Sequence, residues 1–339
     1  MKLKSVSKKF ANDEKAKQIR LLSSSIFEGA RSGGYAMLPV GKNKELRPVY
    51  FPFILVPEDS IKNLYAPIRQ EVLDYFERYD IAWWNQSVDH YFPTGQLLSS
   101  QNHCLNHLFA IRKDYDAVLA MINALSDRYK FECVLPSPLD KKEWCVVDSK
   151  KFEQPNYITF EFALANKTLL GERGNSRGAK CTSVDALIYA QSVDGKRILI
   201  PIEWKYTEAY KPLHRASQAS INRYPPLIDD NSTLQEWLEM YEYDPYYEFA
   251  RQELFMEQII KRHPHTIDEA LMADDYLHII VCPQEHKELR NAIFDFKGTL
   301  RFPWKLECKS QQELLAPLKE SNDSKLKALI NYLEERYWN

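Results

Sequence analysis

The chain has 339 residues, a length that allows one large domain or two of ordinary size. Hydrophobic residues make up 45% and charged residues 27%, as in globular proteins with a sizeable core. The formal net charge of −2 at pH 7 excludes a pervasive positive field, so any binding of nucleic acid must use a local cationic patch. Glycine occurs only 10 times, and neither G-x-G-x-x-G nor G-x-x-x-x-G-K-[ST] is present, which leaves nucleotide-binding folds without a motif.

The cysteines and the N-terminus indicate a reducing compartment. The N-terminal 20 residues lack the apolar segment of a signal peptide, and no apolar run approaches the ~18 residues of a membrane span. We therefore expect a soluble, cytoplasmic protein whose six cysteines are free thiols, since no two of them form a C-x-x-C pair. They are Cys104, Cys133, Cys145, Cys181, Cys282 and Cys308.

The first 130 residues are predicted to be mainly helical. Residues 1–20 carry seven Lys or Arg against two acids, which predicts a solvated helix, with a phosphate-contacting arm as the alternative. Four of the ten glycines fall in residues 29–41, which we expect to form a loop. Apolar residues at helical spacing then predict three amphipathic helices, over residues 61–79, 99–111 and 115–129.

The middle of the chain changes to strand patterns. Residues 157–165 are rich in β-branched and aromatic side chains, and two further strands are predicted over 182–191 and 197–206. Asp194-Gly195 lies between the latter two, and a D-G pair between apolar runs is a strong hairpin signal. A helix over 246–261 and a buried strand over 276–282 follow. Residues 229–257 contain nine acids and one Arg, which predicts a solvated surface unsuited to DNA.

The second strand of this hairpin ends in a charged pair. Residues 198–202 are apolar on both faces, and Glu203 and Lys205 then point to the same side because strand residues alternate. The hairpin brings Asp185 alongside Glu203, so two carboxylates and a lysine are expected together. Adjacent carboxylates repel unless a cation lies between them, and hard oxygen ligands favour Mg²⁺ or Mn²⁺. The pattern predicts metal-assisted phosphodiester hydrolysis, with a salt-bridged strand end as the alternative.

The pattern D-x17-E-x-K on a β-hairpin, followed by a helix and a strand, resembles the PD-(D/E)XK nuclease superfamily. T-S-x-D-A at 182–186, E-W-K-Y-T-E at 203–208 and S-S-Q-x-x-C-x-N-x-x-F at 99–109 resemble uncharacterised bacterial restriction-endonuclease-like proteins. The resemblance implies an α/β fold whose restriction-endonuclease-like core has a mixed central sheet flanked by helices. The expected organisation is a mainly helical N-terminal part over residues 1–130, the nuclease-like core over 131–310 and a C-terminal helix over 311–339.

The resemblance also implies roles for individual residues. Asp185, Glu203 and the backbone carbonyl of Trp204 would bind Mg²⁺ or Mn²⁺, and Lys205 would be the catalytic lysine. Superfamily members often add an upstream acid, for which Glu172 is the first candidate and Glu161 the second. The upstream motif implies that Gln101 and Asn106 support the site, with an ordinary amide-bearing helix face as the alternative.

Two departures from the superfamily pattern affect this hairpin. Val184 stands where the motif's proline is expected, a change that the superfamily tolerates. Pro201 lies inside the third strand, where it removes a hydrogen-bond donor from the ladder. We therefore expect either a bulge at Pro201 or a position at which its nitrogen faces no partner.

The expected substrate is DNA, taken as double-stranded. Duplex cleavage needs two sites, which a homodimer would supply, and the sequence leaves the oligomeric state open. The glycine-rich segment 166–180 offers Arg173, Arg177 and Lys180 for phosphate contacts, unless it is only a solvated loop. Two other functions remain open: a carbohydrate-active hydrolase with paired carboxylates, and a nuclease-fold DNA-binding protein without catalysis. His103 and His107, spaced i, i+4, are read as packing or surface histidines, with a zinc pair as the alternative.

Overall fold

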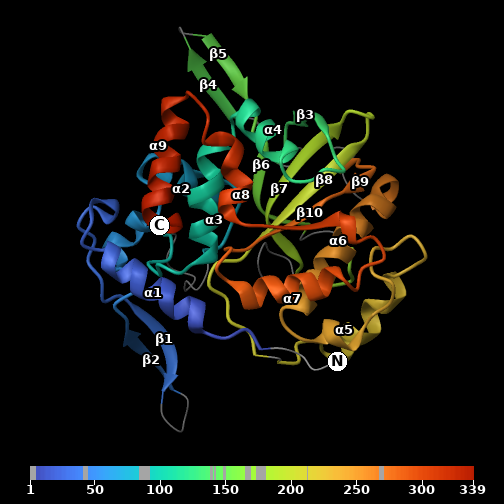
Figure 1. Cartoon of the computed structure of the whole chain (residues 1–339), viewed down its shortest axis with the longest axis horizontal. Helices are drawn as coiled ribbons and strands as arrows, with labels where there is room; N and C mark the ends of the chain where they lie inside the picture. The colour runs from blue at the N-terminus through green and yellow to red at the C-terminus, as the bar shows by residue number, and fades with distance from the viewer. Residues whose placement is uncertain are drawn as a thin grey trace. The chain divides into compact units, whose positions relative to one another are not determined.

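The computed structural model describes residues 5–40, 45–83, 92–137, 140, 143–147, 150–164, 169–172, 181–211, 213–266 and 271–339 (Figure 1). Two compact units make up the chain: unit 1 consists of residues 1–7 and 111–321, and unit 2 of residues 8–110 and 322–339. The division expected from the sequence, with boundaries after residues 130 and 310, remains a prediction.

Unit 1 is built around a mixed seven-stranded sheet in the order β11-β10-β8-β7-β3, with β6 paired to β7 and β9 to β8. β7 is antiparallel to β3, β6 and β8, whereas β8, β10 and β11 are parallel. The strands are β3 (Phe131–Leu135), β6 (Ile158–Ala163), β7 (Ser183–Ser192), β8 (Arg197–Trp204), β9 (Asp275–Tyr276), β10 (His278–Val281) and β11 (Leu306–Lys309).

In the described part of unit 1, five α-helices accompany the sheet: α4 (Tyr115–Asn123), α5 (Gln218–Arg223), α6 (Tyr246–Thr266), α7 (Lys287–Lys297) and α8 (Gln311–Leu315). A separate hairpin, β4 (Glu143–Val147) and β5 (Lys150–Gln154), extends away from the sheet (Figure 1). The main core forms where α6 and α7 pack on the sheet, because β8 is buried from Ile198 to Trp204 and α6 contributes Phe249, Leu254 and Ile259. The predicted α/β class, with a mixed sheet flanked by helices, is confirmed.

Unit 2 contains α1 (Lys9–Leu21), the hairpin of β1 (Tyr35–Val40) and β2 (Glu45–Tyr50), α2 (Arg69–Arg78), α3 (Ser100–Leu108) and α9 (Ser324–Leu333). Two sequence expectations differ from this. Part of the loop expected over 29–41 is strand β1, and the helix expected from residue 61 begins at Arg69. Pro67 lies in the 3₁₀ turn Ala66–Ile68, and a proline cannot donate the backbone hydrogen bond of a helix interior.

The strand ladder passes Pro201 without a bulge. Leu187 pairs with Pro201, within a continuous antiparallel register from Ala186–Ile202 to Gln191–Arg197. On the other edge of β8, the pairing with β9 ends at Leu199 and the pairing with β10 begins at Ile202. Pro201 therefore lies where the parallel partner changes from β9 to β10, a position that tolerates a missing donor.

Candidate metal-dependent nuclease site

The site lies at the open end of the β7–β8 hairpin. Ala186 is opposite Ile202, and this register places the preceding residue, Asp185, beside Glu203. The backbone N–H of Trp204 donates to Oδ2 of Asp185 at 2.6 Å, which fixes the aspartate against the partner strand. The Asp194-Gly195 turn at the other end sets this register, because Gly195 adopts the positive φ of 82° that the turn requires.

Glu203 and Lys205 form a buried ion pair on the same side of the chain. Their side chains are only 6% and 5% exposed, and Nζ of Lys205 lies 2.7 Å from Oε1 of Glu203. The backbone N–H of Lys205 donates to the carbonyl of Val281 at 2.8 Å, which extends the pairing of β8 with β10 by one residue. The strand pattern predicted this common orientation.

Among the described residues, several carboxylates surround Lys205 at this end of the hairpin. Burial, together with the charge of Glu161, raises the pKa of Asp185 well above its ordinary value. Burial and the charge of Asp185 likewise raise the pKa of Glu203. Burial opposes the charged form of Lys205, but Glu203 and Glu248 outweigh it and raise the pKa of the lysine. In this described part of the site the ammonium of Lys205 is thus shared by several carboxylates, and a further cation would relieve their repulsion.

Helix α6 adds two side chains that the sequence did not single out. Glu248 accepts a hydrogen bond from Nζ of Lys205. One turn further, Nε2 of Gln252 donates to Oε2 of Glu203 at 2.5 Å and to the carbonyl of Ser183 at 3.0 Å. Their i, i+4 spacing on the predicted helix was the available signal, since it places both on one helix face.

The acid-rich segment 229–257 is more than the solvated surface that composition suggested. Glu253 is fully buried and binds Nδ1 of His278 at 2.8 Å and the hydroxyl of Tyr276 at 2.6 Å. Glu257 is also buried and accepts the backbone N–H of Thr233. Glu253 thus ties α6 to β9 and β10, and Glu257 ties the helix to the backbone at Thr233, as expected for buried carboxylates, which need hydrogen-bonding partners.

Of the two upstream acids, Glu161 lies nearer in register to Asp185. Phe160 is opposite Ala186 and Phe162 opposite Val184, so Glu161 is at the level of Asp185. Glu161 also has a φ of 50°, a left-handed conformation that is uncommon outside glycine.

Glu172 is engaged in a separate polar cluster. It accepts hydrogen bonds from the backbone and hydroxyl of Thr182, from the hydroxyl of Tyr224 and from the guanidinium of Arg251. Arg251 and the Thr182 contacts hold the pKa of Glu172 below its usual value although burial raises it. Its ligand role remains a prediction, and these contacts give it a structural role: they join residue 172 to residue 182 and to α6.

The remaining candidates are the three cations of segment 166–180 and the two amides of the upstream motif. Arg173, Arg177 and Lys180 lie outside the described residues. Gln101 and Asn106 belong to unit 2, where Gln101 donates to the carbonyl of Ala82 at 3.3 Å. Asn106 accepts from the backbone of Tyr65 at 2.7 Å and donates to the hydroxyl of Tyr337 at 2.8 Å. These bonds give both amides a role inside unit 2, and their support of the site remains a prediction.

His107 is not arranged as a zinc ligand. Its Nδ1 lies 2.7 Å from the carbonyl of His103, which can only accept, so Nδ1 carries the proton. Nε2 accepts the indole N–H of Trp338 at 3.3 Å. Burial lowers the pKa of His107 to about 3, so the neutral ring is part of the unit 2 core.

The donors of the hairpin end fit a hard divalent cation. Within the described parts of the chain, no group of three or more His, Cys, Asp or Glu side chains could hold a metal ion. Asp185 and Glu203 nevertheless form an adjacent carboxylate pair whose ionisation is opposed by burial and by neighbouring carboxylates. Mg²⁺ typically takes one or two protein carboxylates and completes its coordination with waters and substrate phosphate.

A family model described as a restriction endonuclease associating with ARP matches residues 31–338, which include the entire β7–β8 hairpin and α6. Comparisons with curated proteins and with solved structures find no match. Among the described helices, none is long and apolar enough to cross a membrane. The match confirms the restriction-endonuclease-like character and fold expected from the sequence, and the chain belongs to the family of restriction endonucleases associating with ARP.

Proposed function

We propose that the protein hydrolyses phosphodiester bonds of DNA at the end of the β7–β8 hairpin, with Mg²⁺ or Mn²⁺ bound there, in a restriction or defence role. The observation that supports this most is the pair Asp185 and Glu203. Both carboxylates are held in place, and the pKa of each is raised because burial and neighbouring negative charge oppose ionisation. A divalent cation would stabilise both ionised forms.

Asp185, Glu203 and the backbone carbonyl of Trp204 would hold the metal. When bound, the ion would act as a Lewis acid on phosphate and lower the pKa of bound water. Lys205 supplies a fixed positive charge beside these groups, since its ammonium is kept protonated by Glu203 and Glu248. That charge suits it to orient water and to stabilise the developing charge of the phosphate rather than to accept a proton.

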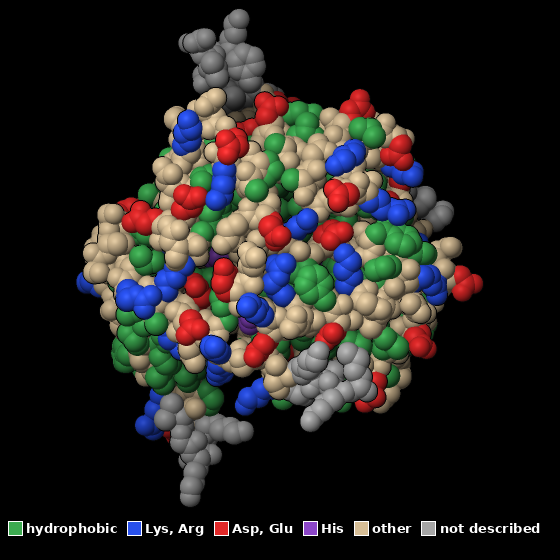
Figure 2. Space-filling view, viewed as in Figure 1, with side chains coloured by type: hydrophobic (Ala, Val, Ile, Leu, Met, Phe, Trp, Pro, Cys, Tyr) green, Lys and Arg blue, Asp and Glu red, His purple; other side chains and the backbone are tan. Residues whose placement is uncertain are grey.

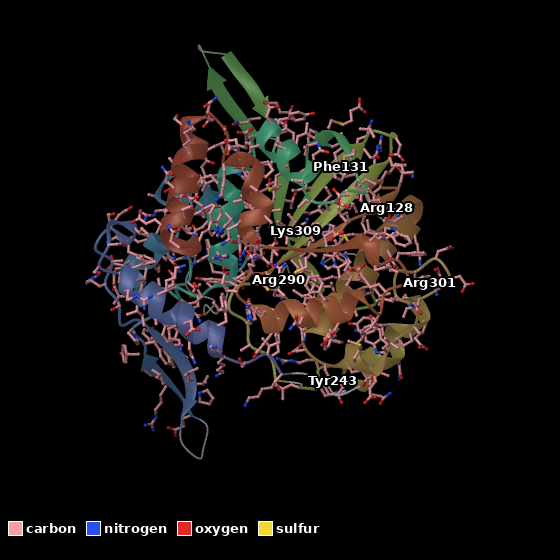
Figure 3. The ribbon with its side chains drawn as sticks, viewed as in Figure 1. Arg128, Phe131, Tyr243, Arg290, Arg301 and Lys309 are labelled. Atoms are coloured by element: carbon pink, nitrogen blue, oxygen red, sulfur yellow. The ribbon has the colours of Figure 1, made fainter. Side chains whose placement is uncertain are left out.

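DNA would need cations near the hairpin end. Figure 2 shows Lys and Arg interspersed with Asp and Glu over the visible face, so charge there is mixed. At the carboxyl ends of the parallel strands, Trp204 is opposite Val281 and Val281 opposite Lys309. Arg290 donates to the carbonyl of the residue after Val281, Cys282, at 3.0 Å. Arg290 and Lys309 (Figure 3) therefore lie at the same end of the sheet as Lys205, on the side of β10 and β11.

A direct assay separates this function from its alternatives. The protein is incubated with supercoiled plasmid, single-stranded DNA and RNA, with Mg²⁺, with Mn²⁺ and with EDTA. A metal-dependent DNA endonuclease nicks or linearises plasmid only when the metal is present. Binding of DNA without cleavage in either metal would favour the non-catalytic alternative. Hydrolysis of a glycoside that persists in EDTA would favour the carbohydrate-active alternative, which has no need of Lys205.

The family description also speaks of association with ARP, and we propose that unit 2 carries the surface for this partner. Its β1–β2 hairpin exposes large apolar side chains, with Met37 50% and Leu46 65% exposed. Beside β1 lies a cavity of about 580 Å³ lined by residues that include Tyr35, Met37 and Phe92. Exposed apolar patches of this kind mark protein interaction sites.

Co-expression with ARP tests this surface. Met37→Ser combined with Leu46→Ser should reduce the ARP that co-purifies with the tagged chain. Val193→Ser is the matched control, because Val193 is 67% exposed but belongs to unit 1. Undiminished recovery of ARP with the double variant would contradict the assignment.

A further inference from the structure

Lys205 lies between two carboxylates that differ in exposure. Glu203 is 6% exposed and contacts Nζ of Lys205 through Oε1, whereas Glu248 is 40% exposed and contacts the same Nζ through Oε2. One carboxylate thus belongs to the sheet and the other to the helix α6. The lysine is itself only 5% exposed, so it depends on these two partners for its charge.

Glu203 already has a partner on each of its carboxylate oxygens. Its Oε1 faces Lys205 at 2.7 Å and its Oε2 accepts from Gln252 at 2.5 Å. A metal ion at Glu203 would compete with the ammonium of Lys205 for the same carboxylate. If Glu203 were the lysine's only anionic partner, binding the metal would leave a buried ammonium without compensation, which is strongly unfavourable.

Resting on the proposed function, we propose that Glu248 is a positioning residue that retains Lys205 when Glu203 turns to the metal. Glu248 is placed for this by α6, which several contacts fix against the sheet. Gln252, one turn along, binds Glu203 and the carbonyl of Ser183. Arg251 binds Glu172 at 2.8 Å, and Glu253 binds His278. Glu248 therefore lowers the free energy of releasing Glu203 and raises the affinity of the site for metal.

The proposal makes a prediction for metal binding that is independent of turnover. In titration calorimetry with MgCl₂ or MnCl₂ and no DNA, Glu248→Gln should weaken metal binding about tenfold, equivalent to ~1.4 kcal/mol. Lys205→Ala should strengthen binding, because it removes the competing cation. In the Lys205→Ala background, Glu248→Gln should change the affinity less than about twofold, because the effect of Glu248 is expected to pass through the lysine.

Glu242→Gln is the matched control. Glu242 precedes α6 in the chain and accepts from His214 at 2.8 Å, so its variant should bind metal as the wild type does. Glu248→Asp keeps the charge and should recover part of the affinity, and thermal unfolding checks that each variant is folded.

The outcomes distinguish the inference from the proposed function. If Glu248→Gln weakens binding equally with and without Lys205, then Glu248 is itself a metal ligand and the proposal is overturned. Unchanged affinity in Glu248→Gln overturns it as well. If the wild type binds neither Mg²⁺ nor Mn²⁺, the proposed function fails and the inference fails with it. If the wild type binds the metal and Asp185→Asn does not, the proposed function stands whatever the Glu248 variants show.

Discussion

The backbone N–H of Trp204 donates to Oδ2 of Asp185 at 2.6 Å, across the two strands of one hairpin. This bond favours the ionised carboxylate, yet burial and the charge of Glu161 outweigh it and raise the pKa of Asp185. The hairpin therefore holds a carboxylate in a place where its charge is electrostatically unfavourable. Such an arrangement at a fixed geometry is typical of functional sites and supports the metal-binding role proposed for this pair.

The first prediction concerns the ammonium of Lys205. Lys205→Ala should slow cleavage by about 10²–10³-fold, the effect of removing one preorganised charge-stabilising group. Its effect on DNA binding should be far smaller. Lys205→Arg should not restore the rate, since the guanidinium is larger and planar and the space between Glu203 and Glu248 is built around one nitrogen. Single-turnover cleavage and fluorescence-anisotropy binding measure the two effects, and a wild-type rate in Lys205→Ala would reduce the lysine to a structural ion pair.

The second prediction separates a structural from a metal-binding role of Glu172. Glu172→Gln keeps an acceptor for Thr182 but weakens the ion pair with Arg251. We expect the free energy of unfolding to fall by about 1–3 kcal/mol, with Mg²⁺ affinity unchanged. Urea unfolding and titration calorimetry report the two quantities. Lost metal affinity in a variant of wild-type stability would instead make Glu172 the upstream ligand.

The third prediction is a pH dependence of unit 2. His107 is neutral when folded, with its pKa lowered to about 3 by burial, whereas in the unfolded chain it has a pKa near 6.5. Below pH 6.5 the unfolded state binds more protons than the folded state. The contribution of His107 to the free energy of unfolding is therefore fully present above this pH and is lost as the pH drops toward 3. His107 alone should remove about 2 kcal/mol between pH 7 and pH 5.

Hydrogen exchange of α3 at pH 7 and pH 5, corrected for intrinsic rates, measures this loss. His107→Gln should remove much of the dependence, although His103, whose pKa is also lowered by burial, contributes its own share. Equal protection at the two pH values would show that His107 is protonated without penalty.

The fourth prediction locates the DNA. Arg173→Ala combined with Arg177→Ala should weaken binding to all sequences alike, and each lost phosphate contact should reduce the log–log salt slope by about 0.9. Lys309→Ala should do the same if DNA crosses the carboxyl ends of β8, β10 and β11. Lys196→Ala is the control, because Lys196 pairs with Asp194 at the opposite end of the hairpin. An unchanged salt slope in the double arginine variant would move the DNA path away from residues 166–180.

The sequence predicted the hairpin because the signals are local. The D-G turn fixes the register, apolar residues on both faces indicate burial, and alternation sends Glu203 and Lys205 to one side. These rules need no knowledge of the rest of the fold, so counting from the turn brings Asp185 alongside Glu203 to within one position. The exact register depends on the length of the loop: Ser192 pairs with Lys196 around a three-residue loop, which places Asp185 next to Glu203.

Contacts between distant segments could not be derived in this way. Glu248 binds Lys205 at a separation of 43 positions, and Arg336 donates to the carbonyl of Asn63 at a separation of 273. Composition alone suggested that the acids of α6 face solvent. A carboxylate can be recognised as buried only when its partner is known, and composition does not identify that partner. The burial of Glu253 depends on His278 and Tyr276, which a strand pattern alone does not assign to it.

The most direct test of the central claim is cleavage of supercoiled plasmid by wild type and by Asp185→Asn, each with Mg²⁺ and with EDTA. The substituted amide would keep an acceptor for the backbone N–H of Trp204 while removing the charge, so the hairpin should stay folded. The account predicts that wild type converts plasmid to nicked and linear forms only with Mg²⁺, and that Asp185→Asn does so in neither condition. Cleavage by Asp185→Asn at the wild-type rate, or wild-type cleavage that persists in EDTA, would contradict it.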